Sequence, residues 1–184
     1  MFFRLRKKIG EYYLKREQIR LDRKRKLINL RDARRIGILF TLDGISDYEK
    51  METLVRTLQN EQKEIKALGF VRNTNLVSRF LPKLSYDFFS IKDLTWFYKP
   101  IHEKVHDFVT REFDILIDLS MYDCFPLRYI AGISKARCRV GRYSEENTGC
   151  FDLLIGSKPS MTIDDYFAQI HHYLTIINKD EQGH

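Results

Sequence analysis

The feature that most constrains the fold is an apolar run in the middle of the chain, Phe113–Ser120, with the sequence FDILIDLS. The run is rich in branched residues. It follows a segment with helical character and precedes Pro126, which opens another. Short apolar runs in this setting are typical of strands buried on both faces of a parallel sheet. We therefore expect Phe113–Ser120 to be the central strand of an α/β domain.

Further strands alternate with helices along the rest of the chain. Strands are expected at 35–41, 70–75, 86–90, 138–141 and 151–156, and helices at 46–68, 100–112, 126–133 and 162–178. This alternation predicts a mostly parallel sheet with helices on both faces. The chain has 184 residues, which suits one domain. The expected fold is a single Rossmann-like three-layer domain of about five to six strands over residues 34–184, preceded by a basic helix over residues 1–33.

The charge of the chain is divided unevenly. Residues 1–35 hold 14 Lys and Arg against 4 Asp and Glu, whereas the remaining residues hold 18 and 21, so a basic segment is joined to a mildly acidic body. Such asymmetry points to an anionic partner. The candidate contact residues are Arg16, Arg20, Arg23, Lys24, Arg25 and Lys26. RNA or the ribosome is the first expectation for that partner, and an anionic membrane surface is the second.

The basic segment also carries apolar residues at helical spacing. One broad face would hold Phe2, Leu5, Ile9, Tyr12, Tyr13, Ile19, Leu27 and Leu30. A thinner seam would hold Phe3, Leu14, Leu21 and Ile28. Aromatic side chains among cations suit base stacking and membrane insertion equally. Three alternatives stay open: the ends of the helix pack on the body, the helix docks on an anionic partner, or it mediates self-association.

The sequence also bears on location. No run approaches the length of a membrane span, and the charges of Met1–Lys8 are not followed by the apolar region of a signal peptide. Cys124, Cys138 and Cys150 lack metal-ligand spacing and are expected to be small buried thiols of a reducing compartment. A cytoplasmic protein without a cofactor is the expectation, with peripheral membrane attachment as an alternative.

One motif resembles a zinc site. His102, Glu103 and His106 match H-E-x-x-H, in which two His one helical turn apart bind zinc and Glu acts as general base. The pair sits at the margin of the apolar stripe formed by Ile101, Val105, Phe108 and Val109. We interpret the motif as a chance match on a solvated helix face.

A small-ligand site is predicted from the expected topology. In a doubly wound sheet of order 3-2-1-4-5-6 the chain reverses between strands one and four, and ligands bind at the carboxyl ends of the strands there. The residues at these ends are Thr41, Asp43, Ser46, Ser120 and Asp123. The turn after the first strand lacks the glycine-rich phosphate motifs.

The segment Phe113–Tyr143 resembles a known family. FDILIDLS followed by PLRYIAGISKARCRVGRY is similar to the back half of the N-terminal domain of heptosyltransferase-like, GT-B type glycosyltransferases, including the R-x-G strand at Arg139–Gly141. In that family an acceptor-side loop carries a Gly-Asp pair with a catalytic Asp. Its counterpart here is Ser46-Asp47, so the resemblance implies Asp47, or Asp43 nearby, as a catalytic candidate.

Two functions follow from the sequence. The first is a binding protein, not an enzyme, whose basic N-terminal helix docks on an anionic partner. The alternative is a glycosyltransferase-related domain that binds a small ligand at the ends of strands one and four. Shared fold does not carry shared activity, so the resemblance implies the fold more than the reaction.

Overall fold

Six parallel strands form one sheet in the order β3-β2-β1-β4-β5-β6. The structure, a computed structural model, describes residues 2–73 and 84–177. The strands are β1 (Arg35–Leu42), β2 (Glu64–Val71), β3 (Tyr86–Ser90), β4 (Ile115–Asp118), β5 (Cys138–Arg142) and β6 (Leu153–Ile155). The predicted α/β class, parallel sheet and strand order are confirmed.

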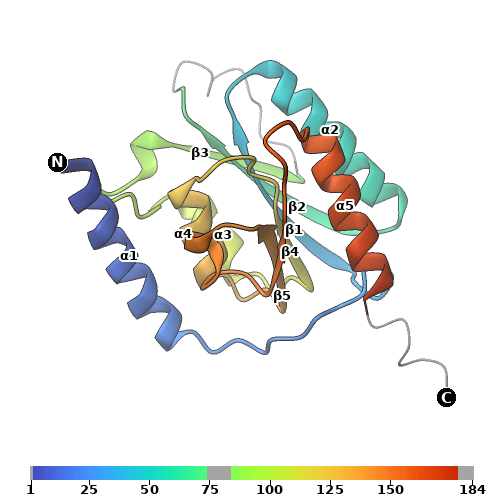
Figure 1. Cartoon of the computed structure of the whole chain (residues 1–184), viewed down its shortest axis with the longest axis horizontal. Coiled ribbons are helices and arrows are strands. Elements are labelled where there is room, and N and C mark those ends of the chain that lie inside the picture. Colours follow the sequence, from blue (N-terminus) through green and yellow to red (C-terminus); the bar gives the residue numbers. More distant parts are fainter. Residues whose placement is uncertain (1, 74–83, 178–184) are drawn as a thin grey trace.

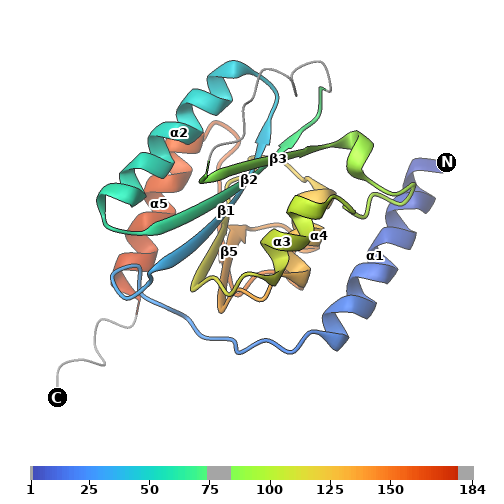
Figure 2. The same ribbon diagram turned by 180° about the vertical axis from the view of Figure 1, so that it is seen from behind.

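Helices cover both faces of the sheet (Figures 1 and 2). The helices are α1 (Phe2–Arg20), α2 (Ile45–Asn60), α3 (Glu103–Thr110), α4 (Phe125–Ile133) and α5 (Ile163–Ile176), with short 3₁₀ turns η2 (Ile91–Asp93) and η3 (Glu145–Asn147). One face is covered by α2 and α5, and the other by α3 and α4. Helix α1 packs outside α4 and adds a further layer on that side. Thr162 caps α5, where its hydroxyl accepts the Asp165 N–H.

Strand β4 occupies the centre of the sheet, between β1 and β5. Ile115 and Ile117 join the core on the α2 and α5 side, and Leu116 joins the core on the α3 and α4 side. All three side chains are buried. The interpretation of this run as a central strand covered on both faces is confirmed, because alternate residues of one short strand supply two separate cores. The strand is shorter than the predicted 113–120, since only Ile115–Asp118 have strand structure.

The second strand lies earlier in the chain than predicted. A helix was expected to continue to residue 68, but α2 ends at Asn60 and β2 already begins at Glu64. Gln62 has φ of 62°, a conformation that cannot continue a helix. The segment that follows is rich in helix formers, yet burial of Ile65 and Leu68 beside β1 outweighs that preference. The predicted end of the last helix, at residue 178, lies outside the described residues.

The N-terminal helix is shorter than the predicted 1–33. It ends at Arg20, and residues 21–34, which we call the strap, have no helix or strand. The strap passes beneath the amino ends of the strands (Figure 1). Its backbone N–H groups at Lys26 and Leu30 donate to the carbonyls of Arg137 and Leu174. The buried Asn29 amide donates to the Thr175 and Ile177 carbonyls. These contacts with the body replace the helical hydrogen bonds that propensity alone would favour.

Two glycines allow α1 to approach the body closely. Gly10 and Leu14 are the buried residues of α1. A Cβ added at Gly10 would lie 2.5 Å from the Phe97 carbonyl oxygen, and one at Gly132 of α4 would lie 2.8 Å from a Leu14 methyl. These separations are shorter than any side chain tolerates without movement. Helix α1 is therefore part of the packed domain along its length, and it does not project as an arm.

Two further expectations have a structural outcome. The three cysteines are free and buried, as predicted. Burial raises the pKa of Cys124 to about 12 and that of Cys138 to about 11. Within residues 2–73 and 84–177, no helix has the length and apolar character that crossing a membrane requires.

Candidate functional site

Side chains bridge the ends of β1 and β4, where the small-ligand site was predicted. The two strands lie side by side with Leu39 opposite Asp118. Just beyond them, the Tyr122 hydroxyl donates to Asp43 Oδ2 at 2.7 Å. Burial, and then the neighbouring Asp43 carboxylate, raise the pKa of Tyr122 to about 12. The phenol therefore stays neutral and spans the gap between the two strand ends.

The catalytic candidate Asp47 has a structural contact. Its Oδ2 accepts hydrogen bonds from the backbone N–H groups of Asp43 and Gly44, both at 3.0 Å. Gly44 occupies the N-cap position of α2, which begins at Ile45 and not at the expected residue 46. A carboxylate that accepts two backbone N–H groups at the start of a helix stabilises that helix, because its negative charge interacts favourably with the positive end of the helix dipole. Ser46 is exposed, and Thr41 is half-buried at the end of β1.

Asp118 and Ser120 form a closed pair at the end of β4. Asp118 Oδ1 accepts the Ser120 N–H at 2.9 Å and the Ser120 hydroxyl at 2.6 Å. Burial raises the pKa of Asp118, although the two bonds from Ser120 act in the opposite direction. A carboxylate in the middle of a buried run needs such partners, and Ser120 provides them from two residues away.

Asp123, the last of the predicted ligand residues, forms ion pairs with Lys7 of α1 and Arg128 of α4. Its Oδ2 pairs with Lys7 Nζ of α1 at 2.7 Å. Both residues line a cavity of about 280 Å³ at the carboxyl ends of β2 and β3, whose walls include Phe3, Phe70 and Phe125. Sequence reasoning missed this cavity because one wall comes from α1, which is remote in the chain.

The inner face of α1 is held by its acidic residues. Glu11 Oε1 accepts from the buried Arg128 guanidinium at 2.6 Å. Glu17 Oε1 accepts from Lys99 Nζ at 2.6 Å and from the Tyr129 hydroxyl at 2.7 Å. These two glutamates are the only acids between Phe2 and Arg20. Because both face the body, the solvent side of α1 is left with cations.

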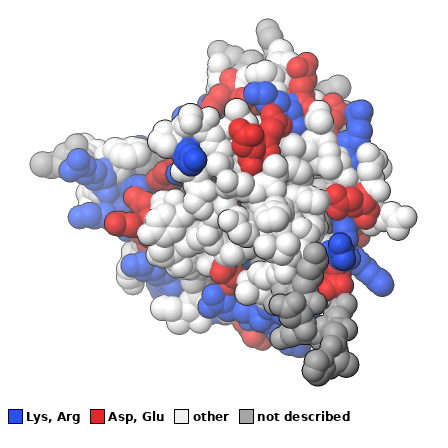
Figure 3. Space-filling view, turned by 45° about the vertical axis from the view of Figure 1, so that its right-hand side comes forward, with Lys and Arg blue, Asp and Glu red and all other residues white. Residues whose placement is uncertain are grey.

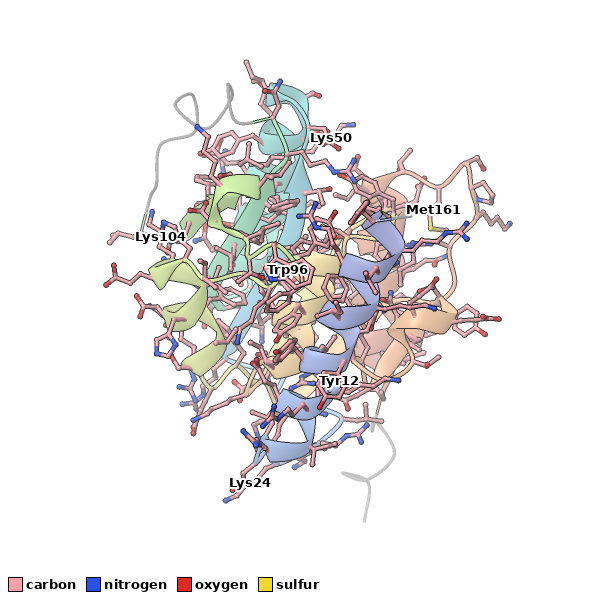
Figure 4. All side chains as sticks on the ribbon, turned by 90° about the vertical axis from the view of Figure 1, so that its left-hand side faces the viewer. Tyr12, Lys24, Lys50, Trp96, Lys104 and Met161 are labelled. Atoms are coloured by element: carbon pink, nitrogen blue, oxygen red, sulfur yellow. The ribbon has the colours of Figure 1, made fainter. Side chains whose placement is uncertain are left out.

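Most of the predicted apolar face of α1 is exposed, although Tyr13 stacks on Phe97 of the body with ring centroids 4.8 Å apart. Phe2, Tyr12 and Ile19 are 82, 62 and 86% exposed, and of the predicted thin seam Leu14 is buried whereas Phe3 is 64% exposed. Figure 4 shows Tyr12 on the outer helix and Trp96 beside it. Gly10 and Leu14 are the buried residues of α1, and polar side chains such as Lys7 and Glu11 make ion pairs on the same side, so apolar spacing alone did not identify the docked side of the helix.

Two of the candidate cations, Arg23 with its buried side chain and the largely exposed Arg25, form ion pairs with the body. The Arg23 guanidinium donates to both carboxylate oxygens of Asp152 at 2.6 and 2.7 Å, and Arg25 Nε donates at 2.8 Å. Burial alone would raise the pKa of Asp152, but the bonds from Arg23 and the Arg139 N–H hold that pKa below its usual value. Arg23 and Arg25 thus fasten the strap to the segment before β6.

A basic cleft lies at the amino ends of the strands. The cleft has a volume of about 640 Å³ and is lined by the end of α1, the strap and the body. Its cationic walls are Arg20, Arg23, Lys24, Arg35, Lys135 and Arg137, against the carboxylates Asp22 and Glu112. Arg16 and Lys26 are exposed outside it. Cations lie along the borders of the molecule, whereas the centre of the face in Figure 3 is largely uncharged.

The H-E-x-x-H motif does not form a zinc site of the helical type. Helix α3 begins at Glu103, so His102 precedes it as the cap, and its Nδ1 accepts the Lys104 N–H at 3.1 Å. The helix was expected to begin at residue 100. Across the described part of the chain, no group of three or more His, Cys, Asp or Glu side chains is placed to hold a metal ion.

Comparison with known proteins identifies a family whose function is unknown. No curated protein and no solved structure matches the chain. A family of unknown function, DUF6913, matches residues 6–177. The match includes most of α1, the strap and the whole described sheet. The chain therefore belongs to the DUF6913 family.

Proposed function

We propose that this chain is a cytoplasmic binding protein, not an enzyme, whose basic cleft binds the phosphate backbone of RNA. The observation that carries the proposal is the cleft itself, in which cations from α1, the strap and the body line one hollow. Lys24 and Lys135 are more than a hundred residues apart in sequence yet line the same hollow. A built arrangement of this kind is more specific than a basic segment alone.

Three cations of the cleft are available to a ligand, whereas Arg23 and Arg137 pair with Asp152 and Asp114. No carboxylate within the described residues forms an ion pair with Arg20, Lys24 or Lys135, and all three are exposed. Exposed unpaired cations bind phosphates by releasing condensed counterions, which makes the affinity depend on salt. The Arg23–Asp152 pair holds the strap in place, so little conformational entropy is lost when the ligand binds.

The shape of the cleft favours RNA over a membrane. A bilayer presents a broad surface and cannot enter a hollow lined by Arg35 and Lys135 at the strand ends, whereas a single strand can follow it. The outer face of α1, with exposed Tyr12 and Ile19, is the surface that would suit a membrane or a second copy of the chain. We place the main site in the cleft because the unpaired charges converge there.

Binding of a labelled oligouridylate, measured by fluorescence anisotropy at low salt, tests the proposal. Lys24→Glu should weaken binding about tenfold, because it replaces an attraction with a repulsion. Lys50→Glu is the matched control. Figure 4 places Lys50 and Lys24 at opposite ends of the molecule. Equal weakening by both variants would indicate a general charge effect. If the protein bound anionic vesicles but not RNA, and if Ile19→Asp abolished the vesicle binding, a membrane would be favoured as the partner.

The glycosyltransferase-related alternative rests on the resemblance of Phe113–Tyr143. It requires a ligand between the ends of β1 and β4, the position spanned by the Tyr122–Asp43 hydrogen bond. If Tyr122→Phe opened that gap to a nucleotide sugar or sugar acceptor, saturable binding would appear in calorimetry and would favour the alternative. We expect no such binding.

A further inference from the structure

The cavity beneath the first turns of α1 has the location of a ligand site. It lies where β2 and β3 end and is closed by Asp123–Pro126, which lead from β4 into α4. The carboxyl ends of parallel strands are where α/β domains bind small molecules. The cavity of about 280 Å³ is near the lower end of the range for such sites, roughly 300–1,000 Å³.

The walls of the cavity are mainly apolar and aromatic. Phe3, Phe70, Leu94, Tyr98 and Phe125 line it from α1, β2, the loop after η2 and α4. Phe3 packs against Tyr98 with ring centroids 5.6 Å apart. Aromatic walls that are not filled by the protein's own side chains favour a flat or aliphatic group.

The polar groups of the cavity carry a surplus positive charge. Asp123 is shared by two cations, because its Oδ2 lies 2.7 Å from Lys7 Nζ and its Oδ1 lies 3.7 Å from Arg128 Nε. The Arg72 guanidinium rests on the Tyr122 ring at 4.6 Å and, among the residues that the structure describes, no carboxylate forms an ion pair with it. A guanidinium fixed on a ring presents its edge, which matches a carboxylate in a bidentate arrangement.

We propose that this cavity binds a small amphipathic carboxylate, with the apolar body between Phe70 and Phe125 and the carboxylate on Arg72. Lys7 supplies a second donor if the ligand displaces Asp123. Because Phe3 and Lys7 belong to α1, the bound molecule contacts both α1 and the sheet and adds to the forces that hold them together. This site is separate from the basic cleft and does not depend on RNA binding.

Calorimetry with two matched probes tests the site. 4-Phenylbutyrate and 4-phenyl-1-butanol share the same apolar body and differ in the carboxylate. The carboxylate should bind about tenfold more tightly than the alcohol, since a charge-assisted hydrogen bond is lost in the alcohol. In Arg72→Gln the two probes should bind equally, because only the carboxylate probe loses affinity.

A second variant and a control make the result decisive. Ile91 lines the cavity and is 53% exposed, so Ile91→Trp can occupy the cavity without disturbing the core, and it should weaken both probes. Arg111→Gln removes an exposed charge outside the cavity and should change neither. Absence of carboxylate binding at millimolar concentration in the wild type would overturn the proposal. Equal binding of the two probes would also overturn it, as would equal effects of Arg72→Gln and Arg111→Gln.

Discussion

Arg23 and Asp152 form a bidentate ion pair, at 2.6 and 2.7 Å, in which each side chain is only 8% exposed. The pair joins the strap to the residue that precedes β6, across more than a hundred residues of sequence. It is where the basic N-terminal segment becomes part of the domain, and it fixes the position of Lys24 beside the cleft.

Removing Arg23 should destabilise the protein. Arg23→Ala leaves the Asp152 carboxylate buried with Arg25 as its remaining side-chain partner. Loss of one partner of a buried pair costs about 3 kcal/mol, measured as the free energy of unfolding in urea. Arg16→Ala, which removes an exposed arginine of α1, should cost less than about 0.5 kcal/mol. Equal costs for the two variants would show that the Asp152 pair does not hold the strap.

The same pair predicts a response to acid. The pKa of Asp152 is lowered in the folded state, so its contribution to stability is complete above the unfolded value of about 3.9. That contribution is lost as the pH falls through the lowered folded pKa. The difference in unfolding free energy between the wild type and Asp152→Asn should therefore be constant near neutral pH and should shrink below pH of about 4. A difference that persists unchanged in acid would contradict this.

Asp118 predicts the opposite pH dependence. Its pKa is raised by burial, so the folded protein retains the proton after the unfolded chain has lost it, and stability falls as the pH rises above about 3.9. Asp118→Asn keeps an oxygen that can accept both bonds from Ser120. In urea unfolding at pH 7, this variant should be more stable than the wild type, because it has no carboxylate whose ionisation burial opposes. The gain should vanish near pH 4, and a loss of stability at pH 7 would contradict the assignment.

Gly132→Ala tests the close packing of α1. Alanine normally favours a helix interior over glycine by about 1 kcal/mol. Here the new methyl group would meet Leu14 and Gln18 at under 3 Å, so the variant should be destabilised and α1 should become accessible to protease. Gly156→Ala is the control, because nothing lies within 4 Å of its new Cβ. If Gly132→Ala is as resistant as the wild type, α1 is not held on α4 in this way.

The sequence predicted the sheet well because local and tertiary preferences agree there. Phe113–Ser120 is a short branched run that only a doubly covered strand can bury. Prediction failed where the local and tertiary preferences conflict. Glu64–Leu68 consists of helix formers, but pairing with β1 makes it a strand. The strap has helical composition, yet Asn29 and Arg23 find partners on α5 and before β6.

The candidate sites were harder to predict because their parts come from distant segments. Asp123 was identified from its place after β4, but its partner Lys7 lies at the other end of the chain. Glu11 and Glu17 could have indicated which face of α1 docks on the body, because acidic residues on one side of a basic helix need cationic partners. Apolar spacing obscured that signal.

Lys135 gives the most direct test of the basic cleft. It lies outside the basic N-terminal segment, and only the fold brings it beside Lys24. Oligouridylate affinity should be measured across a salt series for the wild type and Lys135→Glu. The cleft predicts weaker binding and a salt slope reduced by about 0.7, the value for one phosphate contact on a single strand. Unchanged affinity and slope, together with a loss of binding in Arg16→Glu, would contradict the cleft and place binding on the outer face of α1.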